Sequence, residues 1–90
     1  MKLVILYRPQ SEHASAVQTF VHDFKYQHDA SRIELIDADT REGIATASLY
    51  DLMSLPAMLA LRDDGAVLQV WQGDMLPLMD EVASYLVNQG

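Results

Sequence analysis

The sequence predicts an α/β fold in which a four-stranded mixed sheet carries helices on both faces. Apolar runs of strand length and segments of helical period follow one another in the order βαβ-α-ββα. A strand–helix–strand unit places its two strands in parallel, and a later hairpin adds antiparallel strands to the same sheet. The chain has 90 residues, half of them apolar, which favours a single domain over residues 1–90.

The first half of the chain contains the strand–helix–strand unit. The continuous apolar run over residues 3–7 is typical of a strand covered on both faces. A helical period begins at Ser11, and its apolar face consists of Val17, Phe20, Val21 and Phe24. The stretch RIELIDAD, residues 32–39, predicts the second strand. Asp39 or Thr40 can then cap a short second helix over residues 41–50.

The second half predicts a hairpin and a last helix. Pro56 stands before the third strand, and AMLALR and AVLQVWQ flank an Asp-Asp-Gly turn in which Gly65 supplies a positive φ. Asp74 is expected to cap the last helix, with Pro77 in its first turn, where a missing N–H is tolerated. The apolar face of this helix is expected to consist of Met79, Val82, Ala83 and Leu86.

Charge and composition exclude several function classes. Thirteen acidic and six basic residues give a formal charge of −7, which a nucleic-acid backbone or an anionic membrane would repel. No apolar run approaches the ~18 residues of a membrane span, and MKLVILY is too short for a signal peptide. The chain has no cysteine, which excludes disulfides, thiolate metal sites and thiol redox chemistry, and fits a cytoplasmic location.

The element order, with a proline before the third strand, resembles the thioredoxin fold in its minimal, glutaredoxin-like form. VILYRPQSEHASAV is similar to the family's first strand, active-site loop and first helix, and ELIDAD to its second strand. SLPAMLAL followed by DDG is similar to the cis-proline loop and the hairpin. The resemblance covers essentially the whole chain and implies a cis peptide bond before Pro56, at the mouth of a groove.

The family's pair of catalytic cysteines is missing. When Pro9 is placed at the proline that often precedes the first cysteine, Ser11 and Ala14 fall on the two cysteine positions, within a register of about one residue. Disulfide exchange requires a thiolate, so we expect no thiol–disulfide oxidoreductase activity, no catalytic residue and no cofactor. The Thr-Val-Pro with which glutaredoxins hold glutathione is replaced here by Ser-Leu-Pro.

The side chains near the positions that match the family's active site have ordinary structural explanations. Ser11 is expected to be the N-cap of the first helix, with its hydroxyl accepting from a backbone amide. His13 is expected to be solvated, Asp37 and Asp39 to lie at a solvated strand end, and Trp71 to lie at the sheet edge. The histidines do not have the spacing of a metal site.

The leading prediction is a redox-inactive binding domain, an adaptor or chaperone-like module that holds another protein or an extended peptide. Free backbone groups at Leu55 would allow β-strand addition. The alternatives are a glutathione-transferase-like enzyme that binds a thiol through Ser11, and a KaiB-like regulatory protein. The oligomeric state is left open. The predicted groove is formed by three loop segments: Arg8, Pro9, Gln10, Ser11, Glu12, His13, Ser54, Leu55, Pro56, Gln72, Gly73 and Asp74.

Overall fold

The computed structural model describes residues 2–28, 32–73, 76–77 and 79–87. Within these residues the elements follow one another in the predicted order. They are β1 (Lys2–Tyr7), α1 (Ala14–Gln27), β2 (Arg32–Asp37), α2 (Arg41–Tyr50), β3 (Ala57–Leu61), β4 (Val67–Gln72) and α3 (Met79–Val87).

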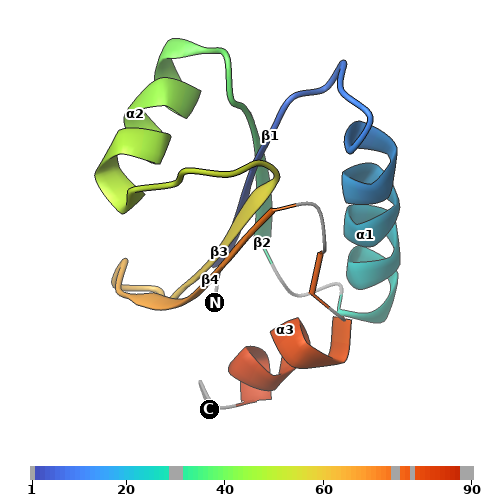
Figure 1. Ribbon diagram of the computed structural model, residues 1–90. Helices are drawn as coiled ribbons and strands as arrows, with labels where there is room; N and C mark the ends of the chain where they lie inside the picture. Colours follow the sequence, from blue (N-terminus) through green and yellow to red (C-terminus); the bar gives the residue numbers. More distant parts are fainter. Residues whose placement is uncertain (1, 29–31, 74–75, 78, 88–90) are drawn as a thin grey trace.

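The strands form one mixed sheet in the order β2-β1-β3-β4 (Figure 1). β1 pairs in parallel with β2 and antiparallel with β3, and β3 and β4 form the predicted hairpin. The central strands β1 and β3 are buried along almost their whole length, as their unbroken apolar runs predicted. Gly65 in the hairpin turn has a φ of +91°. These observations confirm the predicted fold class, and they place Trp71 on an edge strand, as expected.

The helices divide between the two faces of the sheet, α1 and α3 on one and α2 on the other (Figure 1). The predicted apolar stripe of α1 is fully confirmed, because each of its four members is buried against the sheet. Met79, Val82 and Ala83 of α3 pack into the same core cluster. On the opposite face a second cluster, which includes Val4, Leu6, Ile36 and Leu59, packs against residues of α2.

α2 is held to the sheet at its N-terminal end. Thr40 is the cap residue, and its hydroxyl accepts from the N–H of Gly43 at 3.0 Å. Gly43 is the one residue of α2 that is buried. It lies so close to the end of β2 that an added Cβ would stand 2.2 Å from the carbonyl oxygen of Asp37. A glycine is therefore required here for close packing of a helix on a strand end.

The start of the last helix differs from the prediction. α3 begins at Met79, so Pro77 precedes the helix and does not lie in its first turn. Leu76 packs against the α1 side of the core, and a residue before proline is biased towards extended backbone. Leu76 and Pro77 therefore both lie outside the helix. The cap predicted at Asp74 and the side chain predicted for Leu86 lie outside the described residues.

Within the described part of the chain, none of the helices is both long and apolar enough to cross a bilayer.

Candidate functional site

The loop between β1 and α1 folds back on itself before the helix begins. The Ser11 N–H and hydroxyl both donate to the carbonyl of Arg8, at 3.1 and 2.7 Å, and the Ala14 N–H donates to the carbonyl of Ser11. The helix starts only at Ala14, with His13 in the cap position and no side-chain cap. The expectation that Ser11 caps the helix is therefore wrong. Its hydroxyl donates to the turn that precedes it, and a further turn over residues 11–14 separates Ser11 from the first residue of the helix.

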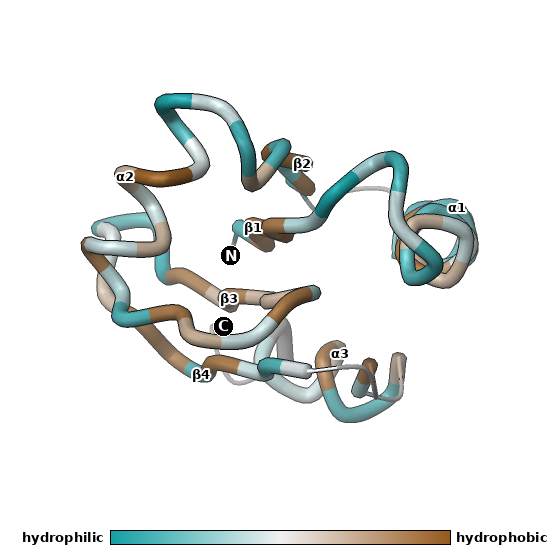
Figure 2. The backbone as a smooth tube through the Cα atoms, turned by 45° about the horizontal axis from the view of Figure 1, so that its top comes forward, coloured by the Kyte–Doolittle hydropathy of each residue, from teal (hydrophilic) through white to brown (hydrophobic). Residues whose placement is uncertain are grey.

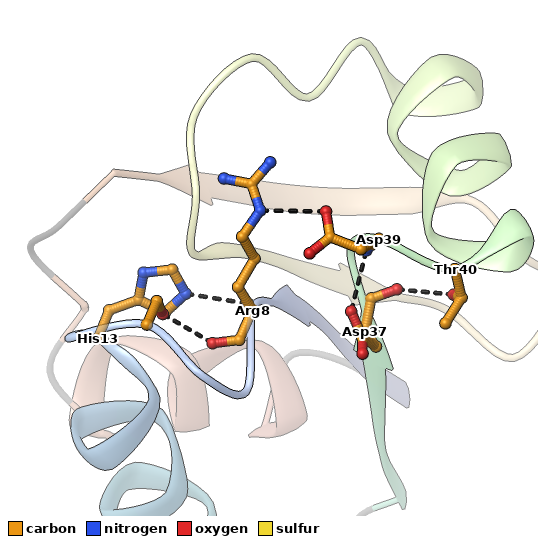
Figure 3. Close-up of polar contacts among 6 residues, drawn as sticks. Arg8, His13, Asp37, Asp39 and Thr40 are labelled. Carbon is orange, nitrogen blue, oxygen red and sulfur yellow. Dashed lines mark hydrogen bonds and ion pairs between the residues drawn. The ribbon is translucent and has the colours of Figure 1, made fainter.

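His13 supports this loop and is not the solvated side chain expected from the sequence. It is half-buried, and its Nε2 accepts from the backbone N–H of Arg8 at 3.1 Å (Figure 3). Its ring lies 6.5 Å from that of Tyr7. The accepting role of Nε2 requires a neutral imidazole with its proton on Nδ1. His13 thus fixes the path of the chain as it leaves β1.

Arg8 joins the first loop to the loop that precedes α2. Its Nε lies 3.2 Å from Oδ1 of Asp39, and both side chains are exposed (Figure 3). Asp37 uses its own carboxylate to accept from the Asp39 N–H at 2.9 Å, and its carbonyl accepts from the Thr40 hydroxyl at 2.7 Å. The two aspartates therefore order the turn before α2. An exposed ion pair of this kind contributes little stability, so its main effect is to hold the Arg8 head group over this loop.

The loop before β3 is braced by the end of β4. The Leu55–Pro56 peptide bond is cis. The side-chain oxygen of Gln72 accepts from the N–H groups of Met53 and Ser54, at 2.7 and 3.1 Å. The Gly73 N–H donates to the carbonyl of Pro56 at 3.0 Å. Two of the three predicted groove segments, the one with Ser54 to Pro56 and the one with Gln72 and Gly73, are therefore in contact. Gln72 and Gly73 support the loop before β3 and were predicted instead to line the groove.

Leu55 is left with unpaired backbone groups. Among the hydrogen bonds of the described residues, none involves its N–H or its carbonyl, and the residue is only half-buried. Its neighbours on both sides are held, Ser54 by Gln72 and Pro56 by Gly73. Among the described residues, the N–H and carbonyl of Leu55 are therefore a donor and an acceptor without a hydrogen bond, between two neighbours that are held in place.

A pocket of about 490 Å³ adjoins Leu55. It lies on the α2 side of the loop, and it is lined by Leu6, Arg8, Ser11, His13, Ala38, Ile44, Ala47, Leu52, Met53 and Leu55. The floor is largely apolar, and the polar side chains come from the β1–α1 loop. Met53 and Ile44 at its rim are 88% and 63% exposed. These two exposed side chains add apolar surface at the rim of the pocket.

The predicted groove is therefore divided. Arg8, Ser11, His13 and Leu55 line the main pocket. Pro9 and Gln10 line a separate cavity of about 350 Å³ with Asp37 and Asp39. Glu12 lies in a third depression with Ser11, His13 and Ala16. Asp74 lies outside the described residues.

Sequence reasoning missed the contribution of α2 and of the loop that follows it. Ile44, Ala47, Leu52 and Met53 line the main pocket, and none of them was predicted to do so. Ile44 stands in a helix whose apolar pattern is weak, and this was the available signal that an apolar side chain faces outwards. In the part of the chain described by the structure, no group of three or more histidine, aspartate or glutamate side chains could hold a metal ion.

No protein-family model matches this sequence, and no curated protein matches it either. Solved structures do match. The germline-specific thioredoxin Deadhead of Drosophila melanogaster is 14% identical with a TM-score of 0.73, over 99% of this chain and 80% of that one. Thioredoxin 1 of Thermosipho africanus is 15% identical with a TM-score of 0.71, over 98% and 92% of the two chains.

An uncharacterized thioredoxin-like protein from Clostridium perfringens is 14% identical with a TM-score of 0.81, over 99% of this chain and 70% of that one. At identities this low, the structural similarity establishes the fold alone. The strand order and the placement of the helices described above agree with it. This cysteine-free chain therefore has a thioredoxin-like fold.

Proposed function

We propose that the chain is a redox-inactive binding domain that holds an extended segment of another protein, in an adaptor or chaperone-like role. The observation that carries the proposal is the unpaired backbone of Leu55 beside a pocket lined by both apolar and polar side chains. An extended peptide satisfies one free N–H and one free carbonyl at the same time, which is the chemistry of β-strand addition.

Backbone pairing at Leu55 would fix the direction of the bound segment, and the pocket would select its side chain. The floor formed by Leu6, Ala47 and Leu52 suits an aliphatic or aromatic group. Met53 at the rim is unbranched and adapts its shape to different ligands. Gln72 and Gly73 would act indirectly, by holding the loop in place before the peptide arrives. Binding would then require little rearrangement of the loop.

The polar rim favours a protein partner over nucleic acid or membrane. Arg8 is paired with Asp39, so the rim does not form a basic patch, and the chain carries a formal charge of −7. The expected location of such a partner is the cytoplasm, in keeping with a chain that has no cysteine.

The enzymatic alternative has weaker support. A glutathione-transferase-like reaction needs a serine hydroxyl that donates to a bound thiolate. The Ser11 hydroxyl already donates to the Arg8 carbonyl at 2.7 Å, and this bond would have to break first. The KaiB-like alternative is disfavoured by the antiparallel pairing of β3 with β4, which form a hairpin with one register shift at Ala60 and Leu61.

Binding of another protein that is permanently unfolded tests the proposal directly. We would titrate the ¹⁵N-labelled domain with reduced, carboxymethylated α-lactalbumin and follow its amide resonances. The amides of Leu55, Met53 and Ile44 should move together. Resonance changes confined to the outer surface of α1, or none at all, would contradict peptide binding in this groove.

A matched pair of variants sharpens the titration. Ile44→Ser removes an apolar side chain from the pocket rim and should weaken binding about fivefold, since its partial burial by a ligand is worth about 1 kcal/mol. Leu49→Ser changes a comparably exposed apolar residue of the same helix, 73% exposed against 63% for Ile44, which does not line this pocket. It should leave the affinity unchanged.

The absence of redox activity is a separate expectation. Because disulfide exchange needs a thiolate nucleophile, the purified protein should reduce neither insulin disulfides nor hydroxyethyl disulfide faster than buffer. Turnover in preparations free of contaminating thioredoxin would sink the redox-inactive reading.

A further inference from the structure

Two further hollows adjoin the main pocket along the loop from β1 to α1, and Ser11 lines all three. Figure 2 shows this loop as largely hydrophilic, in contrast to the apolar strand β1 that it follows. Among the described residues, no carboxylate lines the main pocket. Asp37 and Asp39 line the second hollow, of about 350 Å³, and Glu12 lines the third. The main pocket therefore has acidic side chains in the hollows next to it.

Two of these three carboxylates take no part in an ion pair of the described residues. Asp39 is paired with Arg8 at 3.2 Å (Figure 3). The ion pairs of the described part of the chain include neither Asp37 nor Glu12. The Asp37 carboxylate accepts one backbone N–H, that of Asp39, and Glu12 is exposed. Both carboxylates are therefore open to a cation that a ligand brings.

The basic residues of the chain are used mainly at the opposite end of the sheet. The strand β1 begins at Lys2 and ends at the main pocket. Three ion pairs lie at the end where β1 begins: Lys2–Glu34, Arg32–Asp63 and Arg62–Asp64. Of the other three of the six basic residues, Arg8 is paired with Asp39, and Lys25 and Arg41 line none of the three hollows. The cations of the chain therefore leave the two free carboxylates uncompensated.

We propose that the groove holds an extended segment in which an apolar residue is flanked by lysine or arginine. This inference rests on the proposed function and names the chemistry of its ligand. With the segment paired to the backbone of Leu55 and its apolar side chain in the main pocket, the residues two positions before and after project from the same face. Their cationic head groups would reach Asp37 and Glu12 in the adjoining hollows. The long aliphatic stems of lysine and arginine can meanwhile cover the apolar rim at Ile44 and Met53.

Charge complementarity favours a basic segment over an acidic one or a second copy of this chain. The chain carries a formal charge of −7, which attracts a cationic partner during the encounter and repels an anionic one. An acidic segment would find Arg8 in the main pocket, but Asp39 already offsets the charge of that guanidinium. A lysine or arginine instead meets two carboxylates that no ion pair of the described residues uses.

Titration of the ¹⁵N-labelled domain with three short, end-capped peptides tests the inference. Each peptide has a central leucine, and the residues two positions before and after it are both lysine, both glutamine or both glutamate. The lysine peptide should bind about tenfold more tightly than the glutamine peptide, because it gains two ion pairs, and this advantage should shrink as the salt concentration rises. The glutamate peptide should bind most weakly. Equal affinities, with resonance changes at Leu55 and Ile44, would overturn this inference and leave the proposed function standing. If no peptide moves these two amides, the proposed function fails and the inference fails with it.

Matched charge variants locate the contacts of the lysine peptide. Glu12→Gln and Asp37→Asn should each weaken its binding about threefold and leave the affinity for the glutamine peptide unchanged. Asparagine keeps an oxygen that can accept from the Asp39 N–H, and the exposed change at Glu12 keeps the test valid if Asp37→Asn fails to fold. Asp23→Asn makes the same change of charge on α1, outside the three hollows, and should have little effect. The inference is overturned if Asp23→Asn weakens binding of the lysine peptide as much as Glu12→Gln does, since net charge alone would then explain the attraction.

Discussion

The two faces of the sheet are covered to very different degrees. On one face α1 and α3 enclose a cluster that includes Phe20, Phe24 and Val82, all buried. On the other face α2 buries one of its own residues, Gly43, and leaves Ile44 and Leu49 exposed. The main pocket opens on this second face. The difference indicates that one face of the sheet carries most of the stability and the other leaves apolar surface free for a ligand.

The largest effect should follow from damage to the well-covered face. Phe24 is fully buried and stacks on Phe20 with ring centroids 5.7 Å apart. Phe24→Ala should lower the free energy of unfolding by about 3–5 kcal/mol, because it removes the largest side chain that is fully buried among the described residues and leaves a cavity. Urea unfolding followed by Trp71 fluorescence measures this loss. A loss below 1 kcal/mol would show that this face is not the main source of stability.

The next prediction concerns the attachment of α2 and has an unusual sign. Glycine to alanine inside a helix normally stabilises by about 1 kcal/mol. Gly43→Ala should instead destabilise by about 2 kcal/mol, because the new Cβ would meet the Asp37 carbonyl oxygen at 2.2 Å. Thermal unfolding of the variant and of the wild-type protein measures this difference in stability.

Ala45→Gly is the control for Gly43→Ala. Ala45 is an exposed residue of the same helix, so the change should cost only the ordinary propensity difference of about 1 kcal/mol. If Gly43→Ala stabilised the protein, the close approach of α2 to β2 would be wrong.

Loosening of the loop before β3 should have a smaller effect on stability and a larger one on local opening. Gln72→Ala removes two hydrogen bonds to the amides of Met53 and Ser54, which should cost about 1–2 kcal/mol. Exchange of these two amides should accelerate far more than that of the β1 and β3 amides. Gln18→Ala, an exposed change on α1, provides the control and should leave both quantities unaltered. Equal acceleration throughout the sheet would instead mean that Gln72 stabilises the fold globally.

The smallest effect on stability is expected at the pocket rim. Met53→Ser changes a side chain that is 88% exposed, so its free energy of unfolding should stay within about 0.5 kcal/mol of wild type. Binding of an unfolded chain should nevertheless weaken. Isothermal titration alongside urea unfolding separates these two quantities. A loss of stability without a loss of affinity would remove Met53 from the binding surface.

The sequence by itself determined the elements and their order. Periodicity is a local property, so the buried stripe of α1 and the unbroken apolar runs of β1 and β3 were readable from residue spacing alone. The hairpin turn with Gly65 was readable for the same reason. The absence of cysteine, which excludes thiol chemistry, is visible in the composition.

Only the tertiary structure decided which side chains share a pocket and which backbone groups stay unpaired. Ile44 joins the pocket because Gly43 brings α2 against the end of β2, a contact between segments that no local pattern encodes. Ser11 was assigned to the helix cap because capping residues are common there, but the turns after β1 rotate its hydroxyl to Arg8 instead. The hydrogen bonds of Gln72 and Gln69 could not be predicted from the sequence either. The partners of an amide side chain depend on which donors and acceptors the folded chain places near it.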